Sequence, residues 1–214
     1  PDPLYPLADQ EEFRILPGQW RALWVTAEIG DDTPAGNYRI DVHFESIAGE
    51  QLAVGTYELE VLDAELPPQK LVNTHWFHTD CLAVYYNLDV FSEAHWQRIE
   101  QYVSTAVKHG INMILTPLFT PPLDTEVGGE RPTVQLVDVE KNGDHYTFGF
   151  DRLDRWVALC EGQGIKYFEM SHLFTQWGAG HAPKIIAVED GVEKRIFGWD
   201  TDASGEAYRN FLDQ

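Results

Sequence analysis

The stretch at residues 164–184, GIKYFEMSHLFTQWGAGHAPK, decides how the rest of the chain is interpreted. Its first part is typical of a buried strand, because Ile165, Tyr167 and Phe168 form a short apolar run after a glycine. In parallel α/β folds, ligands bind just beyond the carboxyl ends of such strands. The part that follows is a loop rich in ionisable, hydrogen-bonding and aromatic side chains, and it therefore predicts one wall of a ligand cleft: Glu169, Ser171, His172, Gln176, Trp177, His181 and Lys184.

The region around this stretch alternates between strand and helix patterns, which indicates βα units and a parallel sheet. Ser92 and Asp151 are the expected N-caps of two helices, and Gly110 follows the first of them. Two hairpins, around residues 142–143 and 189–191, interrupt the units and should lie on the ligand face. The expected strands are residues 70–77, 112–115 and 165–168, and the expected helices are residues 92–110, 151–164 and 207–212.

The first part of the chain has a different pattern, with short alternating strands and no helix. The expected strands are residues 20–29, 37–46 and 52–62. Strands without helices predict a small antiparallel β-sandwich. Leu66-Pro67-Pro68 ends the pattern, since proline cannot donate to a strand ladder. We therefore expect a sandwich domain at residues 1–68 and an α/β domain at residues 69–214.

Three βα units are too few for a closed barrel, which needs eight strands and about 250 residues. We expect a multi-domain chain, in which the sandwich precedes the first βα units of a (β/α)8 (TIM-type) barrel that is truncated at Gln214. A complete, small, open α/β sheet is the alternative. A truncated barrel leaves the edge of its last strand exposed, and such edges favour self-association.

The charge of the chain limits the classes of partner. The 214 residues carry a formal net charge of −20. Phosphate groups require Lys and Arg, so nucleic acid and anionic membrane surfaces are not expected partners. Neutral ligands or cations fit this composition better. There is also no apolar run of about 18 residues that would predict a membrane span.

A metal site has to be considered at residues 75–81, because His75, His78 and Cys81 recur at intervals of three residues. In an extended segment, His75 and His78 point to opposite faces, since side chains alternate with a period of two. We therefore expect core or cleft-lining residues here, with no metal and no other cofactor.

Glu169 is the candidate for proton transfer, since it ends an apolar strand. An ion pair with Lys184 or Arg131 is an equally good interpretation of this carboxylate. Hydrolysis of a glycosidic bond normally takes two carboxyl groups, or one carboxyl group and a substrate acetamido group. Trp76, Phe119 and Trp177 offer flat faces for sugar rings. The full set of predicted substrate-binding residues is Trp76, His78, Thr116, Phe119, Arg131, Glu169, His172 and Trp177.

Several short motifs resemble a known family. They are Leu23-Trp24-Val25, the turn at residues 33–38, the Leu66-Pro67 exit, and the segments 116–122 and 171–184. In this order they are similar to proteins related to glycoside hydrolase family 123, a group described as domain of unknown function 4091. The resemblance covers nearly the whole chain.

This resemblance implies a sandwich followed by a (β/α)8 barrel. It also implies retaining hydrolysis of β-linked N-acetylgalactosaminides, in which the substrate acetamido group is the nucleophile and an adjacent Asp-Glu pair late in the barrel assists. No Asp-Glu dipeptide occurs in this sequence. We therefore expect a fragment of a glycoside hydrolase that lacks the catalytic pair. The alternatives are a non-catalytic carbohydrate-binding or scaffold protein, and a small α/β protein that uses Glu169 with His172 in acid-base chemistry.

Overall fold

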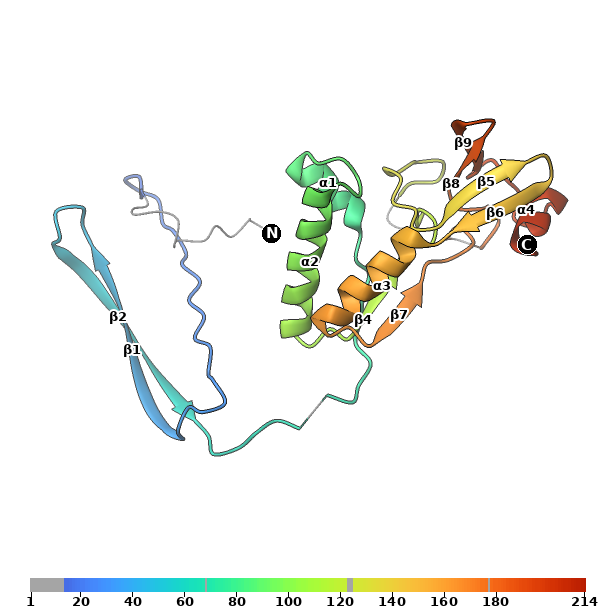
Figure 1. The fold of residues 1–214 in the computed structure, drawn as a ribbon. Helices are drawn as coiled ribbons and strands as arrows, with labels where there is room; N and C mark the ends of the chain where they lie inside the picture. The colour runs from blue at the N-terminus through green and yellow to red at the C-terminus, as the bar shows by residue number, and fades with distance from the viewer. Residues whose placement is uncertain (1–13, 68, 123–124, 177) are drawn as a thin grey trace. The chain divides into compact units, whose positions relative to one another are not determined.

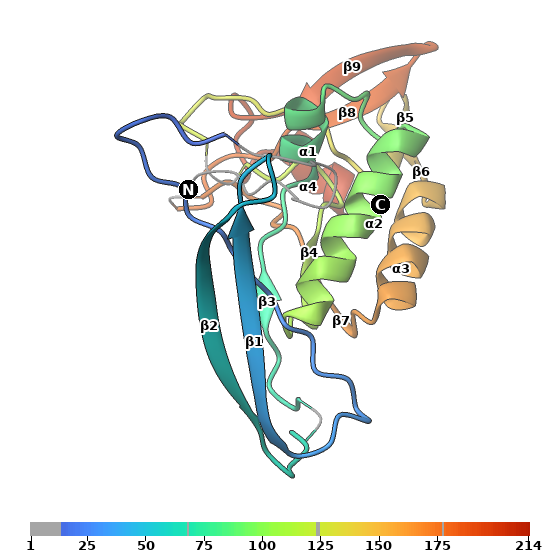
Figure 2. The ribbon, with the colours of Figure 1, turned by 90° about the vertical axis from the view of Figure 1, so that its left-hand side faces the viewer.

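A computed structural model describes residues 14–67, 69–122, 125–176 and 178–214. The chain divides into two compact units, residues 1–68 and 69–214, and each is described by itself. Figures 1 and 2 together label the elements of both units. Within the described ranges, no helix is long and apolar enough to cross a membrane.

The described part of the first unit is a β-hairpin. Strands β1 (Gly36–Glu45) and β2 (Gln51–Val61) pair antiparallel, with Tyr38 opposite Leu59. Two of the three expected strands are therefore confirmed. The third, residues 20–29, is not a strand, and Trp20 and Trp24 are 82% and 79% exposed there. Because the hairpin pairs only with itself, the described residues do not form the expected sandwich.

The second unit contains a parallel sheet with the order β3-β4-β7. Its strands are β3 (Thr74–His75), β4 (Met113–Thr116) and β7 (Tyr167–Met170). All three expected strands are present. The first is much shorter than residues 70–77, because only two of its residues pair with β4: Thr74 with Met113, and His75 with Ile114.

In the described part of this unit, four helices accompany the strands: α1 (Thr79–Tyr86), α2 (Glu93–Lys108), α3 (Asp151–Gln163) and α4 (Glu206–Leu212). The N-cap of α2 is confirmed, since the Ser92 hydroxyl accepts a hydrogen bond from the His95 backbone N–H at 3.3 Å. The predicted N-cap of α3 was wrong by one residue, because Phe150 is the cap and Asp151 lies in the first turn. The short helix α1 was not predicted.

Helices α2 and α3 lie side by side on one face of the parallel sheet (Figures 1 and 2). Their apolar faces meet the sheet in one buried cluster, which includes Ile99, Val103, Ile114, Trp156 and Cys160. The opposite face of the sheet is open in the described chain. Trp76 and Tyr167, which follow the strand alternation onto that face, are each 46% exposed.

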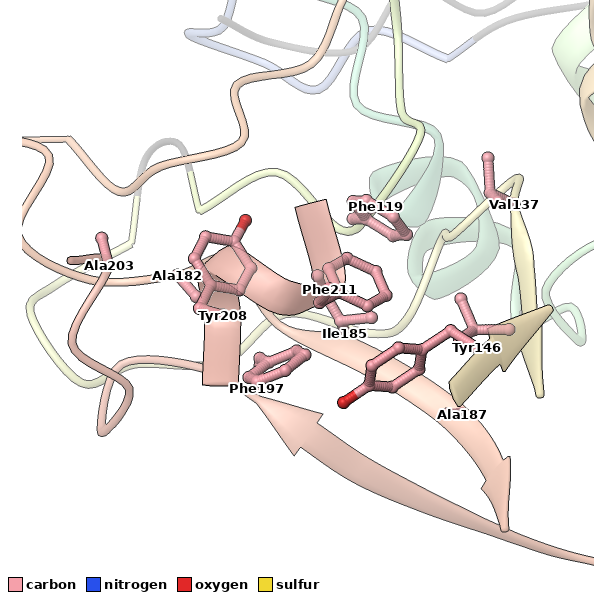
Figure 3. Packing of buried hydrophobic residues seen from close by; sticks show 11 residues of the cluster. Phe119, Val137, Tyr146, Ala182, Ile185, Ala187, Phe197, Ala203, Tyr208 and Phe211 are labelled. Carbon is pink, nitrogen blue, oxygen red and sulfur yellow. The ribbon is translucent and has the colours of Figure 1, made fainter. Parts of the chain in front are cut away.

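The two predicted hairpins are confirmed, and they join into one four-stranded sheet with the order β6-β5-β8-β9. Its strands are β5 (Asp138–Asn142), β6 (His145–Gly149), β8 (Ile185–Glu189) and β9 (Val192–Phe197). The link is a parallel pairing of β5 with β8, which was not predicted. Helix α4 packs against this sheet through a cluster of aromatic rings (Figure 3), which includes Tyr146, Phe197, Tyr208 and Phe211.

Candidate functional site

The parallel sheet brings the candidate residues of three different segments together. Side chains alternate along a strand, so Thr74 and Trp76 share the face that is not covered by α2 and α3. Glu169 pairs with Leu115 of β4 and projects to the same face. His172 follows the end of β7. The strand register therefore places these side chains at one edge of the sheet.

Glu169 is held by two neutral hydrogen-bond donors. The Thr74 hydroxyl donates to Oε2 at 3.0 Å, and the Trp76 indole N–H donates to Oε1 at 3.2 Å. The carboxylate is partly buried. The alternative interpretation, an ion pair with Lys184 or Arg131, does not describe these contacts, since both donors are neutral groups, a hydroxyl and an indole. Among the described residues, these two neutral donors orient the Glu169 carboxyl group.

His172 completes this group. Its exposed ring meets Trp76 edge to face, with the ring centroids 5.9 Å apart and an interplanar angle of 80°. We call Thr74, Trp76, Glu169 and His172 the Glu169 cluster. The sequence analysis missed Thr74, although strand alternation could have found it, because Thr74 lies two residues before Trp76.

Thr116 and Phe119, which were expected to line a sugar cleft, are buried in the core. Thr116 is fully buried, and its hydroxyl accepts a hydrogen bond from the Trp156 indole N–H at 3.2 Å. Phe119 is 6% exposed and packs against Phe211, with the ring centroids 5.6 Å apart. Thr116 therefore joins the parallel sheet to α3, and Phe119 packs against α4.

Arg131 is also structural rather than free to bind a ligand. Its guanidinium donates to both carboxylate oxygens of Asp80, at 2.9 and 3.1 Å, and to the Cys81 sulfur at 3.3 Å. The two charged side chains are only 11% and 5% exposed. This buried ion pair ties the loop around Arg131 to the start of α1. His78, partly buried, is the residue directly before that helix. Trp177 lies outside the described residues.

A buried histidine of α2 also holds the first turn of α1 in place. His95 of α2 accepts a hydrogen bond from the Phe91 backbone N–H at Nδ1, so its Nε2–H donates to the Thr79 carbonyl oxygen, at 2.9 Å in each case. Burial lowers the pKa of His95, which favours this neutral tautomer. Together with the Arg131–Asp80 pair, this contact sets the position of the segment that carries Trp76.

Other parts of the described chain show less promising chemistry. No three His, Cys, Asp or Glu side chains of the described residues gather as metal ligands would. A hollow of about 710 Å³ lies on the four-stranded sheet, away from the Glu169 cluster. Two of its cations are already paired, Arg152 with Asp138 and Arg195 with Asp200. The hollow is therefore lined by groups that already stabilise the sheet.

The Glu169 cluster can bind a polyhydroxylated ligand. A carboxylate and an imidazole exchange hydrogen bonds with hydroxyl groups, and the half-exposed indole of Trp76 offers an apolar face to the C–H side of a sugar ring. The cluster contains one carboxyl group only. Cleavage of a glycosidic bond requires a second such group or help from the substrate itself.

Comparisons with known proteins identify the family of the chain. The model of the family "Glycoside hydrolase 123, catalytic domain" matches residues 76–214. A solved structure of a family 123 glycoside hydrolase from Clostridium perfringens, described in terms of glycolipid glycan hydrolysis, superimposes with a TM-score of 0.62 at 17% sequence identity. The superposition covers 85% of this chain and 32% of that one, so the chain spans about a third of the length of this relative. No curated protein matches. The family match extends over more than half of the chain, and the chain belongs to glycoside hydrolase family 123.

Proposed function

We propose that this chain is the N-terminal part of a hydrolase that acts on β-linked N-acetylhexosaminides, N-acetylgalactosaminides in particular. The Glu169 cluster forms one wall of its sugar cleft. The observation that carries this proposal is the exposed group of a carboxylate, an indole and an imidazole at the ends of parallel strands. This is the edge at which α/β enzymes bind their substrates.

The proposed reaction is a substrate-assisted, retaining hydrolysis. The acetamido oxygen of the substrate attacks the anomeric carbon while a carboxylic acid protonates the departing glycosidic oxygen. Water then attacks the same carbon from the vacated side, so that the configuration is retained. The chain has no Asp-Glu dipeptide, and its coverage of 32% of the solved relative supports a catalytic pair contributed by residues outside it. Glu169 would bind sugar hydroxyls in this scheme.

The open face of the parallel sheet supports the fold that accompanies this proposal. Parallel sheets are normally covered on both faces. Helices α2 and α3 cover one face, and Trp76 and Tyr167 stand half exposed on the other. Further strands of a (β/α)8 barrel would enclose that face, as a β-sandwich would enclose the apolar side of the β1–β2 hairpin. The chain alone would self-associate through the outer edge of β7.

The test compares this chain with one extended to the length of a full family member. Both are assayed for release of p-nitrophenol from its N-acetyl-β-galactosaminide and N-acetyl-β-glucosaminide. We expect activity in the longer chain only. In that chain, Glu169→Gln should lower kcat/KM, and Glu193→Gln, a matched change at an exposed carboxylate of β9, should leave it unchanged. A longer chain that hydrolyses neither compound contradicts the proposal.

A second candidate function is that of a carbohydrate-binding protein without catalysis. It is favoured by the single carboxylate of the cluster and by its two fixed neutral donors, which suit a stable hydrogen-bonding role. This function predicts sugar binding by both chains and hydrolysis by neither. Loss of that binding in Trp76→Ala would distinguish it from a chain that does not recognise sugars.

A further inference from the structure

The outer surface of α1 and α2 carries a group of tyrosines that the Glu169 cluster does not include. Tyr85 is 66% exposed and Tyr102 is 42% exposed. Tyr86 lies between them, with its ring edge to face with Tyr85 at 4.9 Å and its hydroxyl 3.0 Å from that of Tyr102. We call Tyr85, Tyr86 and Tyr102 the tyrosine platform. The packing of α1 onto α2 accounts for the contacts of Tyr86. It does not explain why the rings of Tyr85 and Tyr102 are exposed to solvent.

A cation and an amide extend this platform along α2. The Arg98 guanidinium lies 4.6 Å from the centre of the Tyr86 ring, and its Nη1 donates to the Gln101 side-chain oxygen at 2.8 Å. The hydrogen bond with Tyr86 raises the pKa of Tyr102, so this hydroxyl stays neutral. The platform therefore presents flat apolar rings bordered by hydroxyl groups and one guanidinium.

Gln101 also lines a shallow groove between α2 and α3, so the groove and the platform are joined. The groove has a volume of about 480 Å³. Its only charged side chain is Glu100, which accepts a hydrogen bond from the Gln163 amide at 2.9 Å. All its other lining side chains carry neutral amide or hydroxyl groups, and the complete set is Gln97, Glu100, Gln101, Ser104, Thr105 and Gln163.

We propose that the tyrosine platform and this groove together bind a neutral oligosaccharide. Sugar rings have an apolar C–H face that packs on an aromatic ring, and their hydroxyls pair with amide and hydroxyl side chains. A surface with one guanidinium and one carboxylate, in a chain of net charge −20, suits an uncharged ligand. The site goes beyond the proposed function, because it would hold a glycan chain whether or not the Glu169 cluster acts in hydrolysis.

The test is a titration of the 214-residue chain with a neutral trisaccharide that ends in β-linked N-acetylgalactosamine, followed by NMR. In the Tyr85→Ala/Tyr102→Ala variant we expect the Kd to rise at least tenfold. The matched control Tyr57→Ala, at a tyrosine of the first unit that is 59% exposed, should change the Kd less than twofold. Gln97→Ala/Gln101→Ala, which leaves the packing of α1 intact, should also weaken binding. Circular dichroism checks that each variant is folded.

Three results would overturn this proposal. The first is the absence of any binding by the unchanged chain. The second is binding that Trp76→Ala abolishes and the tyrosine and glutamine variants leave unchanged, which would assign the ligand to the Glu169 cluster. The third is self-association, seen by sedimentation, that the tyrosine variant abolishes without changing the Kd for the sugar. None of these results depends on hydrolysis, which is measured separately in the longer chain.

Discussion

The buried ion pair between Arg131 and Asp80 gives the sharpest test of the structure. In Asp80→Asn the side chain keeps its shape and loses its charge. The Arg131 guanidinium, 11% exposed, would then remain buried and lose the charge of its Asp80 partner. Removing one member of a buried ion pair destabilises a protein by about 3–5 kcal/mol.

That amount is a large part of the stability of a domain, which is about 5–15 kcal/mol. For a unit of this size it corresponds to a fall in Tm of about 10 °C. The matched control is Asp138→Asn. Its partner Arg152 is 40% exposed, so the loss there should be no more than about 1 kcal/mol. Replacing both charged residues, in Asp80→Asn/Arg131→Met, should recover much of the loss, because no unpaired buried charge remains.

Differential scanning calorimetry of the unchanged chain, of these three variants and of Arg131→Met measures these effects. The reasoning is refuted if Asp80→Asn and Asp138→Asn lower the Tm by the same small amount. It is also refuted if Arg131→Met keeps the Tm and loses sugar binding, since Arg131 would then contact the ligand and not secure α1.

Three further predictions follow from buried side chains. Thr116→Val leaves the Trp156 indole N–H without its acceptor, so urea titration should show a loss of about 1–3 kcal/mol, with sugar binding unchanged. Burial lowers the pKa of His95 from its ordinary 6.5, so the stability from its neutral form is present above that pH and is lost as the pH falls below it. Urea midpoints at about pH 8 and pH 5 should therefore differ less in His95→Gln than in the unchanged chain. Burial raises the pKa of the Cys160 thiol to about 12, so a disulfide reagent at about pH 8 should label exposed Cys81 alone until the chain is unfolded.

The elements that the sequence predicted are those specified by residues close together in the chain. Ser92 caps α2 three residues before its partner N–H, and Gly164 ends α3 with a φ of 108°, which favours glycine. The hairpin at residues 189–192 turns through Asp190 and Gly191, both with positive φ. Each of these signals lies within one turn of backbone, so periodicity and turn residues were sufficient to find it.

The features that the sequence missed depend on partners far along the chain. Arg131 and Asp80 are 51 residues apart, and nothing near either residue indicates the other. Thr116 ends a strand, as a cleft residue would, but the Trp156 indole 40 residues later draws its hydroxyl into the core. Trp76 and Glu169 were both expected to line a cleft. The hydrogen bond between them was not predicted, because it depends on the register of three strands. Tertiary contacts of this kind decide between equally good local interpretations.

The parallel pairing of β5 with β8 has a mechanical consequence. It joins Glu140, in the β5–β6 hairpin that follows β4, to Val188, in the β8–β9 hairpin that follows β7. Loops at the ends of neighbouring strands usually move and change length independently. Here the two hairpins are joined by the hydrogen-bonded pairing of β5 with β8. A ligand that orders one hairpin therefore also stiffens the other. Strands that are far apart in the sequence pair slowly. We therefore infer that the four-stranded sheet forms after the helices that support it.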